Sequence, residues 1–250
     1  MIHRREWVYA WLFLGPALLF LFTFTHYPAV KTVFSSFFST PRGRRPAEFV
    51  GLENYQTLIQ DEVFWKVLMN NLWFALGTIP VSIALALLMA LWVNSHLKGR
   101  TLSRVAFFAP TVLPLIAVAN IWLFFYTPGF GLIDQFRSGL FGLPAMNLLG
   151  DPNTVLFAVI VVAIWKEAGF FMIFYLAALQ SIPPVLKEAA DIEGASSFYF
   201  LRRVLLPLLM PTTLFVSINA VINSFRLVDH IIVMTDGGPD NASSLLLFYI

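Results

Sequence analysis

A few polar side chains stand inside long apolar stretches, where they could bind a solute. Asn219, Asn223 and Arg226 follow one another at intervals of four and three residues, so a helix would place them on one face. Amide and guanidinium groups form directed hydrogen bonds, which suit a hydroxyl-rich or anionic ligand. Hydrogen bonds between helices would use the same groups equally well. This stripe therefore predicts either a polar pathway or a polar helix contact.

Two ionisable residues, Lys166 and Glu167, lie near the middle of another apolar stretch. Ionisable groups in such surroundings are costly and usually face a cavity or a partner. Adjacent helical residues point about 100° apart, so we do not expect these two to pair with each other. One of them could face a pathway, or a salt bridge to another helix or subunit could orient the packing. Asn120 is a weaker pathway candidate.

The sequence contains no pattern typical of covalent or metal-assisted catalysis. It has neither a GxxxxGK[ST] phosphate-binding loop nor an HExxH motif. Its four histidines are not paired at metal-ligand spacing, and the absence of Cys excludes disulfides and thiol chemistry. We expect no catalytic residue, no metal and no cofactor on this chain. A net charge of +2 gives no argument for a nucleic acid partner. Because the chain has no catalytic motif of its own, any energy it uses would come from a partner or from a gradient.

Membrane helices are the elements that would position these polar groups in the lipid bilayer. The sequence is 58% hydrophobic and 12% charged, against about 25% charged residues in soluble domains. Five runs approach the roughly 20 apolar residues of a span: 7–28, 72–93, 105–126, 154–180 and 204–225. A sixth run begins near residue 245 and is too short to cross, so we expect the sequence to lack the rest of that span. The predicted fold is all-α: one transmembrane domain over 1–250, a polytopic helical bundle of five full spans plus the start of a sixth.

Prolines interrupt several of these runs and predict kinks, either around a pathway or simply in the packing. The basic residues near the ends of the runs indicate a cytoplasmic N-terminus. The inner side would carry Arg4, Arg5, Lys98, Arg100, Arg104, Lys187, Arg202 and Arg203, and the outer side Lys31, Arg42, Arg44, Arg45, Lys66 and Arg137. The dense KGRTLSR stretch favours this orientation, whereas PRGRRP opposes it.

The stretch KEAADIEGASSFYFLRR, from Lys187 to Arg203, is too charged to cross a membrane. The start of this stretch and the residues just before it could form a short helix, PPVLKEAADIE. Ser181 could cap that helix, Pro183 or Pro184 could start it, and Gly194 could end it at the C′ position. Val185, Ala189 and Ile192 would share one face, and Glu188 and Asp191 another. Such a helix could dock on a soluble partner or lie on the lipid headgroups.

The segment EAADIEGA, followed by VLLP, resembles the EAA loop of ABC-importer permeases. Glu188, Ala189, Ala190 and Gly194 match the family pattern, and Glu193 stands where Asp is usual. After nine residues come Val204, Leu206 and Pro207, with Val in place of Ile. The stretches FVGLENY, AALQSIPP and MTDGGP resemble the carbohydrate branch, whose members carry maltose, other sugars or glycerol-3-phosphate. The resemblance covers nearly the whole chain.

The resemblance implies a cytoplasmic EAA loop over 181–203 whose coupling helix docks on an ATPase. The interface residues it implies are Glu188, Ala189, Ala190, Glu193, Gly194 and Ala195. The implied partners are a dimer of cytosolic ATP-binding subunits, which would hold ATP and Mg, a second homologous permease and an extracytoplasmic solute-binding protein. The implied location is the cytoplasmic membrane of a bacterium or archaeon, and the chain itself would not be an enzyme.

The expected function is therefore carbohydrate import as the permease subunit of an ATP-driven ABC importer. An ion-gradient-driven secondary transporter is the alternative, although the paired repeats typical of that class are not visible. A structural membrane subunit is a further alternative, and it would tolerate apolar replacement of Lys166, Asn223 and Arg226. The sequence does not identify the substrate.

Overall fold

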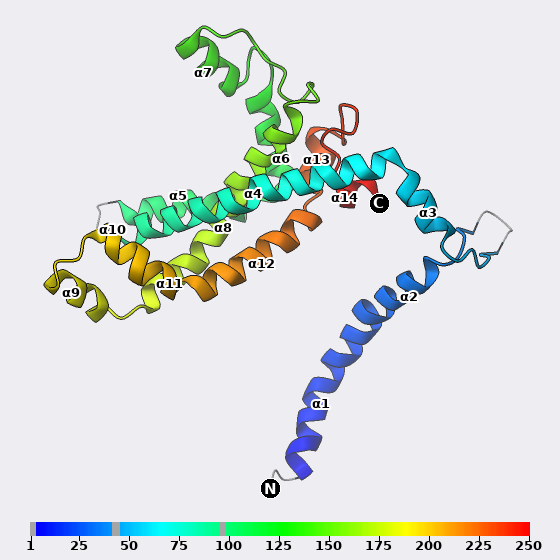
Figure 1. The fold of residues 1–250 in the computed structure, drawn as a ribbon, viewed down its shortest axis with the longest axis horizontal. Helices are drawn as coiled ribbons and strands as arrows, with labels where there is room; N and C mark the ends of the chain where they lie inside the picture. The colour runs from blue at the N-terminus through cyan, green and yellow to red at the C-terminus, as the bar shows by residue number, and fades with distance from the viewer. Residues whose placement is uncertain (1–3, 42–45, 96–98) are drawn as a thin grey trace. The chain divides into compact units, whose positions relative to one another are not determined.

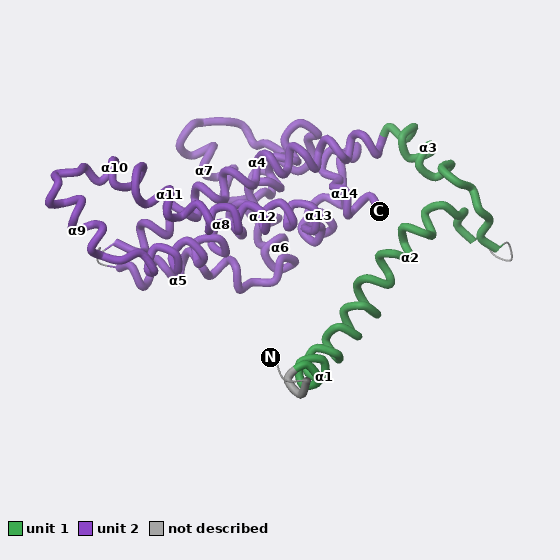
Figure 2. Tube along the Cα trace, turned by 60° about the horizontal axis from the view of Figure 1, so that its bottom comes forward, with its two compact units in different colours: residues 1–62 green, residues 63–250 purple. Residues whose placement is uncertain are grey.

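The chain divides into two units, residues 1–62 and residues 63–250 (Figure 2). The computed structural model describes residues 4–41, 46–95 and 99–250. Within these ranges every regular element is helical apart from one isolated bridge between Phe38 and Phe49. The all-α prediction is therefore confirmed. Arg42, Arg44, Arg45 and Lys98, which were used to predict the orientation, lie outside the described residues, as do the side chains of Arg4 and Arg5.

The first unit is built on one long apolar helix that includes the expected span 7–28. It consists of α1 (Arg4–Leu21), the π-helical turn η1 (Phe22–His26) and α2 (Tyr27–Ser35). The part from Trp7 to Ser35 is apolar enough to cross a membrane, and no residue of its most apolar window is buried within the chain. Within the first unit these side chains therefore have no core to pack into.

The FVGLENY stretch, residues 49–55, leads into the short helix α3 (Glu53–Gln60). The Asn54 amide donates hydrogen bonds to the carbonyls of Ser36 and Phe38 at 2.8 and 2.9 Å. The Tyr55 hydroxyl lies 2.6 Å from that of Ser36. These contacts tie α3 to the end of α2.

The second unit is organised around two uninterrupted helices, α4 (Glu62–Asn94) and α8 (Val155–Ser181), shown in Figure 1. The buried residues of α4 recur every three or four positions, so they form one face; they are Val67, Asn71, Phe74, Thr78, Ser82, Ala86, Ala90 and Val93. Several are small, which lets neighbouring helices approach closely. The largest hydrophobic cluster joins this face to Phe171 and Met172 of α8 and Val216 of α12.

Proline divides two of the expected spans into helix pairs, which corrects their reading as single runs. Residues 105–126 fall in α5 (Arg100–Val112) and α6 (Leu115–Tyr126), which meet at an angle of 104°. Leu113 precedes Pro114 and is extended, with ψ of 137°, because the proline ring disfavours the helical conformation of the residue before it.

The other divided span begins at Ser197 rather than near 204. It comprises α10 (Ser197–Phe200), η2 (Leu201–Leu205), α11 (Leu206–Leu208) and α12 (Met210–Arg226), with a bend of 65° between Leu208 and Met210. Pro211 lies in the first turn of α12, where its missing N–H costs nothing. Among the described residues three helices could cross a membrane uninterrupted, or up to five spans if each bent pair counts as one.

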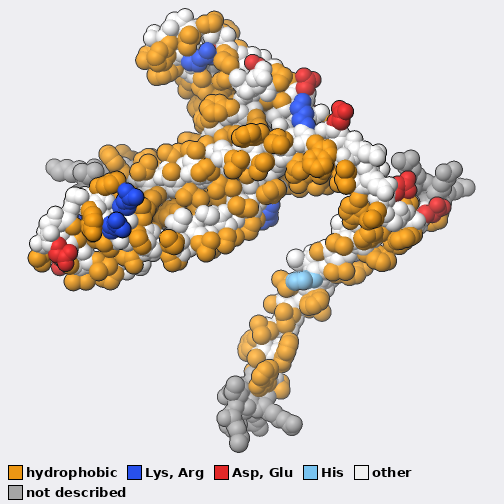
Figure 3. Space-filling model, in the orientation of Figure 1, with side chains coloured by type: hydrophobic (Ala, Val, Ile, Leu, Met, Phe, Trp, Pro, Cys, Tyr) orange, Lys and Arg blue, Asp and Glu red, His pale blue; other side chains and the backbone are white. Residues whose placement is uncertain are grey.

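Four short helices complete the second unit: α7 (Leu132–Phe141), α9 (Val185–Ile192), α13 (Asp229–Met234) and α14 (Leu246–Tyr249). Helix α14 starts where the sixth apolar run was expected. Hydrophobic side chains cover most of the long helices in Figure 3, and charged side chains include a group at the end that carries α9 and α10. The second unit thus has long helices with apolar surfaces and a charged end formed by α9 and α10.

Candidate functional site

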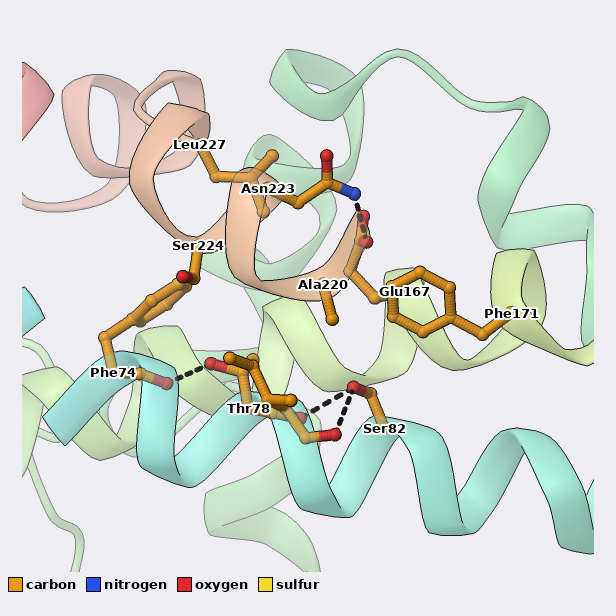
Figure 4. A pocket seen from close by; sticks show the side chains of 10 residues that line it. Phe74, Thr78, Ser82, Glu167, Phe171, Ala220, Asn223, Ser224 and Leu227 are labelled. Carbon is orange, nitrogen blue, oxygen red and sulfur yellow. Dashed lines mark hydrogen bonds between the residues drawn. The ribbon is translucent and has the colours of Figure 1, made fainter. Parts of the chain in front are cut away.

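A small pocket in the second unit brings together Glu167 of α8 and Asn223 of α12 (Figure 4). The Asn223 amide donates a hydrogen bond to a carboxylate oxygen of Glu167 at 2.7 Å. Both side chains are half-buried. The other lining residues come from α4, α8, α12 and the residue after α12: Phe74, Thr78, Ile79, Ser82, Phe171, Ala220, Ser224 and Leu227. A carboxylate and an amide therefore face a pocket otherwise lined by small or apolar groups.

The pocket also contains hydroxyl residues that sequence reasoning missed. Thr78 donates to the Phe74 carbonyl, and Ser82 donates to the Thr78 carbonyl at 2.7 Å. Ser224 donates to the Val221 carbonyl at 2.8 Å. Each of these hydroxyls donates to a carbonyl of its own helix, so it adds a polar atom to the pocket lining without leaving a donor unpaired. The four-residue spacing of Thr78, Ser82, Ala86 and Ala90 was the available signal, since it marks a small-residue helix face.

The other predicted pathway residues point elsewhere. The Lys166 ammonium donates to the carbonyls of Pro110 and Leu113 at 3.2 and 2.6 Å. The amides of Asn120 and Asn219 each bond a carbonyl of their own helix, at Ile116 and Phe215 respectively. The Arg226 side chain is exposed at the end of α12. Of the six candidates, the structure joins Glu167 to Asn223 directly, and it separates Lys166 from Glu167 as the helical geometry predicted.

The EAA segment folds into α9, which closes with the predicted glycine. Gly194 has a φ of +70°. Its N–H bonds the Asp191 carbonyl at 3.2 Å, and the Ala195 N–H bonds the Ala190 carbonyl at 2.9 Å. This double hydrogen bond is a Schellman motif, with Gly194 at C′. The predicted capping by Ser181 is wrong: Ser181 is the last residue of α8, its hydroxyl donates to Ala178, and Pro184 precedes α9 instead.

Helix α9 exposes apolar side chains as well as charges. Ile192 is 88% and Val185 60% exposed, and Glu188, Ala189 and Glu193 are exposed as well. Lys187 forms a salt bridge with Asp191, and its ammonium lies 5.6 Å from the centre of the Phe200 ring. Exposed Ile and Val side chains beside acidic groups are typical of a surface that binds another protein, rather than of one that faces only water.

The loop after α13 is tied to the start of α4. The Asn70 amide donates to the Asn241 carbonyl at 2.8 Å, and the Lys66 ammonium donates to the Asp240 carbonyl. The chain turns at the DGGP sequence, where Gly237 has a φ of +76°. A Cβ there would lie 2.5 Å from the Phe248 ring and the Ser244 hydroxyl. The loop is therefore closely packed against α14 and requires glycine.

Asp134 of α7 organises the segment that follows α6. Its carboxylate accepts hydrogen bonds from the N–H groups of Gly129 at 2.8 Å and Met146 at 3.1 Å, and from Arg137 at 3.2 Å. The Gly129 bond makes the largest contribution to lowering the pKa of the Asp134 carboxyl; the Met146 bond and the Arg137 charge add to it, and desolvation opposes it. The ionised carboxylate thus holds together both ends of this segment.

Residues 63–246 match the family model of the binding-protein-dependent transport system inner membrane component. The chain belongs to this family. The match coincides closely with the second structural unit. This permease is therefore a multi-pass membrane protein and a component of an ABC importer, which sets aside both the gradient-driven transporter and the purely structural subunit.

Named relatives extend the similarity across nearly the whole permease. The sulfoquinovosyl glycerol transport system permease protein SmoG of Agrobacterium fabrum is 32% identical over 240 residues, which cover 96% of this chain and 78% of SmoG. The trehalose/maltose transport system permease protein MalF of Thermococcus litoralis is 33% identical over 247 residues, covering 98% of this chain and 83% of MalF.

A crystal structure of a bacterial ABC transporter involved in the import of the acidic polysaccharide alginate has a similar fold. One of its chains matches with a TM-score of 0.80 and 26% identity, over 98% of this chain and 83% of that chain. An alginate ABC transporter in complex with an alginate pentasaccharide-bound periplasmic protein matches with a TM-score of 0.81 and 24% identity, over 96% of this chain and 80% of that chain.

Proposed function

We propose that this permease imports a carbohydrate, either a sugar or glycerol-3-phosphate, across the cytoplasmic membrane of a bacterium or archaeon. The names of SmoG and MalF support a hydroxyl-rich substrate. The permease domain would have five spans, with the two bent pairs each counted as one, and α14 would begin the sixth. Its N-terminus and the EAA loop over 181–203 would face the cytoplasm.

The substrate pathway would pass the pocket of Glu167 and Asn223. These two groups are paired at 2.7 Å, so a solute hydroxyl could exchange with that hydrogen bond. A hydrogen-bond donor and acceptor placed side by side suit the hydroxyl groups that sugars and glycerol-3-phosphate share. Asn219 and Arg226 would extend the polar face of α12 on either side of Asn223, and Asn120 and Lys166 would lie outside the pocket. This paired carboxylate and amide is the observation on which the proposed pathway rests.

Coupling to ATP would use α9. Its exposed Glu188, Ala189 and Glu193, with Ala190, Gly194 and Ala195, would contact the cytosolic ATP-binding subunits, which form a dimer and hold ATP and Mg. The rigid Schellman end of α9 would transmit the movement of those subunits to α8 and α10. A second homologous permease would complete the pathway, and an extracytoplasmic solute-binding protein would deliver the substrate. This chain would bind no cofactor and catalyse no reaction.

The test is purification from native membranes in mild detergent, followed by mass spectrometry of the proteins that accompany the permease. We expect an ATP-binding subunit and a second permease, and any captured binding protein can be screened with maltose, trehalose and sn-glycerol-3-phosphate. Recovery of the chain alone, still moving solute under a proton or sodium gradient in liposomes, would contradict the proposal.

A further inference from the structure

The break between α5 and α6 leaves backbone carbonyls without their helical donors. In an uninterrupted helix the carbonyl of Pro110 would accept the N–H of residue 114, but Pro114 has none. Leu113 is the residue after α5 and precedes the first turn of α6, so its carbonyl lies outside both helices. Carbonyls without a partner are costly in the hydrocarbon region, where water is absent.

Lys166 supplies the missing donors. Its single ammonium, on the neighbouring helix α8, donates to both carbonyls, at 3.2 Å to Pro110 and 2.6 Å to Leu113. An ammonium has three N–H groups, so it can serve both without losing its charge. A charge within a span needs such compensation, because the bilayer provides none.

The close approach of α5 and α8 makes this contact possible. Gly169 lies three positions after Lys166, on the same helix face. A Cβ on Gly169 would lie 2.2 Å from the Phe107 carbonyl oxygen, so only glycine allows the two backbones to pack at this distance. Gly169 thus brings α5 within reach of the Lys166 side chain.

We propose that Lys166 is a positioning residue for transport, which fixes the bend between α5 and α6 by bonding the carbonyls that Pro114 leaves free. Helix α5 packs on α8, and α6 packs on α13, on α7 and also on α8, where the Tyr126 hydroxyl donates to the Ala158 carbonyl at 2.9 Å. The bend therefore sets how the two halves of this broken span lie along α8.

Glu167, the next residue on α8 after Lys166, lines the pocket with Asn223. One short stretch of α8 therefore joins the bend to the proposed pathway. The transport role rests on the proposed function; the structural role does not.

The bend can be measured directly because the chain has no Cys. Spin labels on cysteines introduced at Leu102 of α5 and Phe124 of α6, which are 75% and 61% exposed, report the separation of the two helices by double electron–electron resonance. The assembled transporter in lipid nanodiscs is compared without substrate for wild type, Lys166→Met and Lys166→Arg. Lys66→Met is the matched control, since Lys66 also bonds a carbonyl, that of Asp240, away from the bend.

We expect a single distance in wild type, Lys166→Arg and Lys66→Met, and loss of that single distance in Lys166→Met. An unchanged distribution in Lys166→Met would overturn the proposal. If Lys166→Met fails to insert, Lys166→Gln, which is neutral and one atom shorter, takes its place with the same expected loss.

Uptake into liposomes separates positioning from substrate contact. With whichever of maltose, trehalose or sn-glycerol-3-phosphate the wild type transports, Lys166→Met should lower the maximal ATP-driven rate and leave the half-saturating concentration unchanged, and Lys166→Arg should restore the rate. A changed half-saturating concentration with an unchanged spin-label distance would instead identify a substrate contact and overturn the inference.

An altered distance with normal uptake would overturn the transport role. Absence of uptake by the wild type would count against the proposed function, while the distance measurement would still decide the structural role.

Discussion

Asn223 of α12 donates a hydrogen bond of 2.7 Å to Glu167 of α8, which joins residues 56 positions apart in the sequence. The bond lies at the edge of a pocket bounded on a further side by α4 (Figure 4). It links two of the helices that frame the proposed pathway. The pair therefore contributes to packing and offers hydrogen bonds to a solute.

A double-mutant cycle measures this pair. Asn223→Ala and Glu167→Ala should each lower the free energy of unfolding in detergent, and their coupling energy should be about 1 kcal/mol, as for hydrogen bonds between membrane helices. The matched control is Asn219→Ala with Glu167→Ala, because the Asn219 amide bonds Phe215 of its own helix. Equal coupling energies in the two cycles would contradict a specific role for Asn223.

Gly169→Ala should destabilise the permease. The added methyl would lie 2.2 Å from the Phe107 carbonyl oxygen, so α5 and α8 would have to separate, at a cost of about 1–3 kcal/mol. Gly139→Ala in α7 is the control, since no atom lies within 4 Å of its Cβ position. Thermal denaturation of the two purified variants compares them, and a Gly169→Ala protein as stable as Gly139→Ala would disprove the close contact.

The segment that follows α6, from Gly129 to Met146, should loosen in acid. Because hydrogen bonds lower the pKa of Asp134 in the folded state, its stabilisation is fully present above the unfolded pKa of about 4. It is then lost as the pH falls through the lower, folded pKa. Protection of the Gly129 and Met146 amides from hydrogen exchange, corrected for the intrinsic rate, should decline over that range. Asp134→Asn should show weaker protection with no such pH dependence, and a wild-type decline that persists in this variant would assign the effect to another group.

Gly194→Val should impair coupling between the permease and the ATP-binding subunits. A β-branched residue at a φ of +70° is strained, at a cost of about 1–2 kcal/mol, so the Schellman end of α9 should open. Gly142→Val is the control, because Gly142 also follows a helix with positive φ, of 61°, but at the end of α7. Only Gly194→Val should reduce substrate-stimulated ATP hydrolysis, and equal activity in the two variants would argue against a coupling role for α9.

Local sequence rules predicted those features that depend on a few neighbouring residues. Gly194 at the end of α9 follows from a backbone conformation that glycine alone adopts easily. The all-α fold follows from the lengths of the apolar runs. The positions of the helix breaks were less accessible: Pro80 lies inside α4 without ending it, whereas Pro114 separates α5 from α6. Whether a proline ends a helix depends on the side chains and carbonyls packed around it, and the sequence alone does not show which groups these are.

In the candidate site, too, the sequence predicted local geometry but not the contacts between distant residues. Helical spacing placed Asn219, Asn223 and Arg226 on one face, and it separated Lys166 from Glu167. It could not tell that Asn223 reaches Glu167, or that Lys166 reaches Pro110, because both contacts join residues 56 positions apart. Thr78 and Ser82 were missed because hydroxyls spaced at four residues in an apolar helix look like ordinary packing positions.

The central claim, that α9 couples this permease to ATP hydrolysis, is tested most directly by Glu188→Arg in the reconstituted transporter. Glu188 is exposed on α9, so the reversed charge should leave folding and insertion intact while disrupting the proposed contact with the ATP-binding subunit. Glu53→Arg, an exposed substitution on α3, is the control. We predict that Glu188→Arg abolishes ATP hydrolysis stimulated by the loaded binding protein while the complex remains assembled in the membrane. Undiminished stimulation, equal to that of Glu53→Arg, would contradict the account.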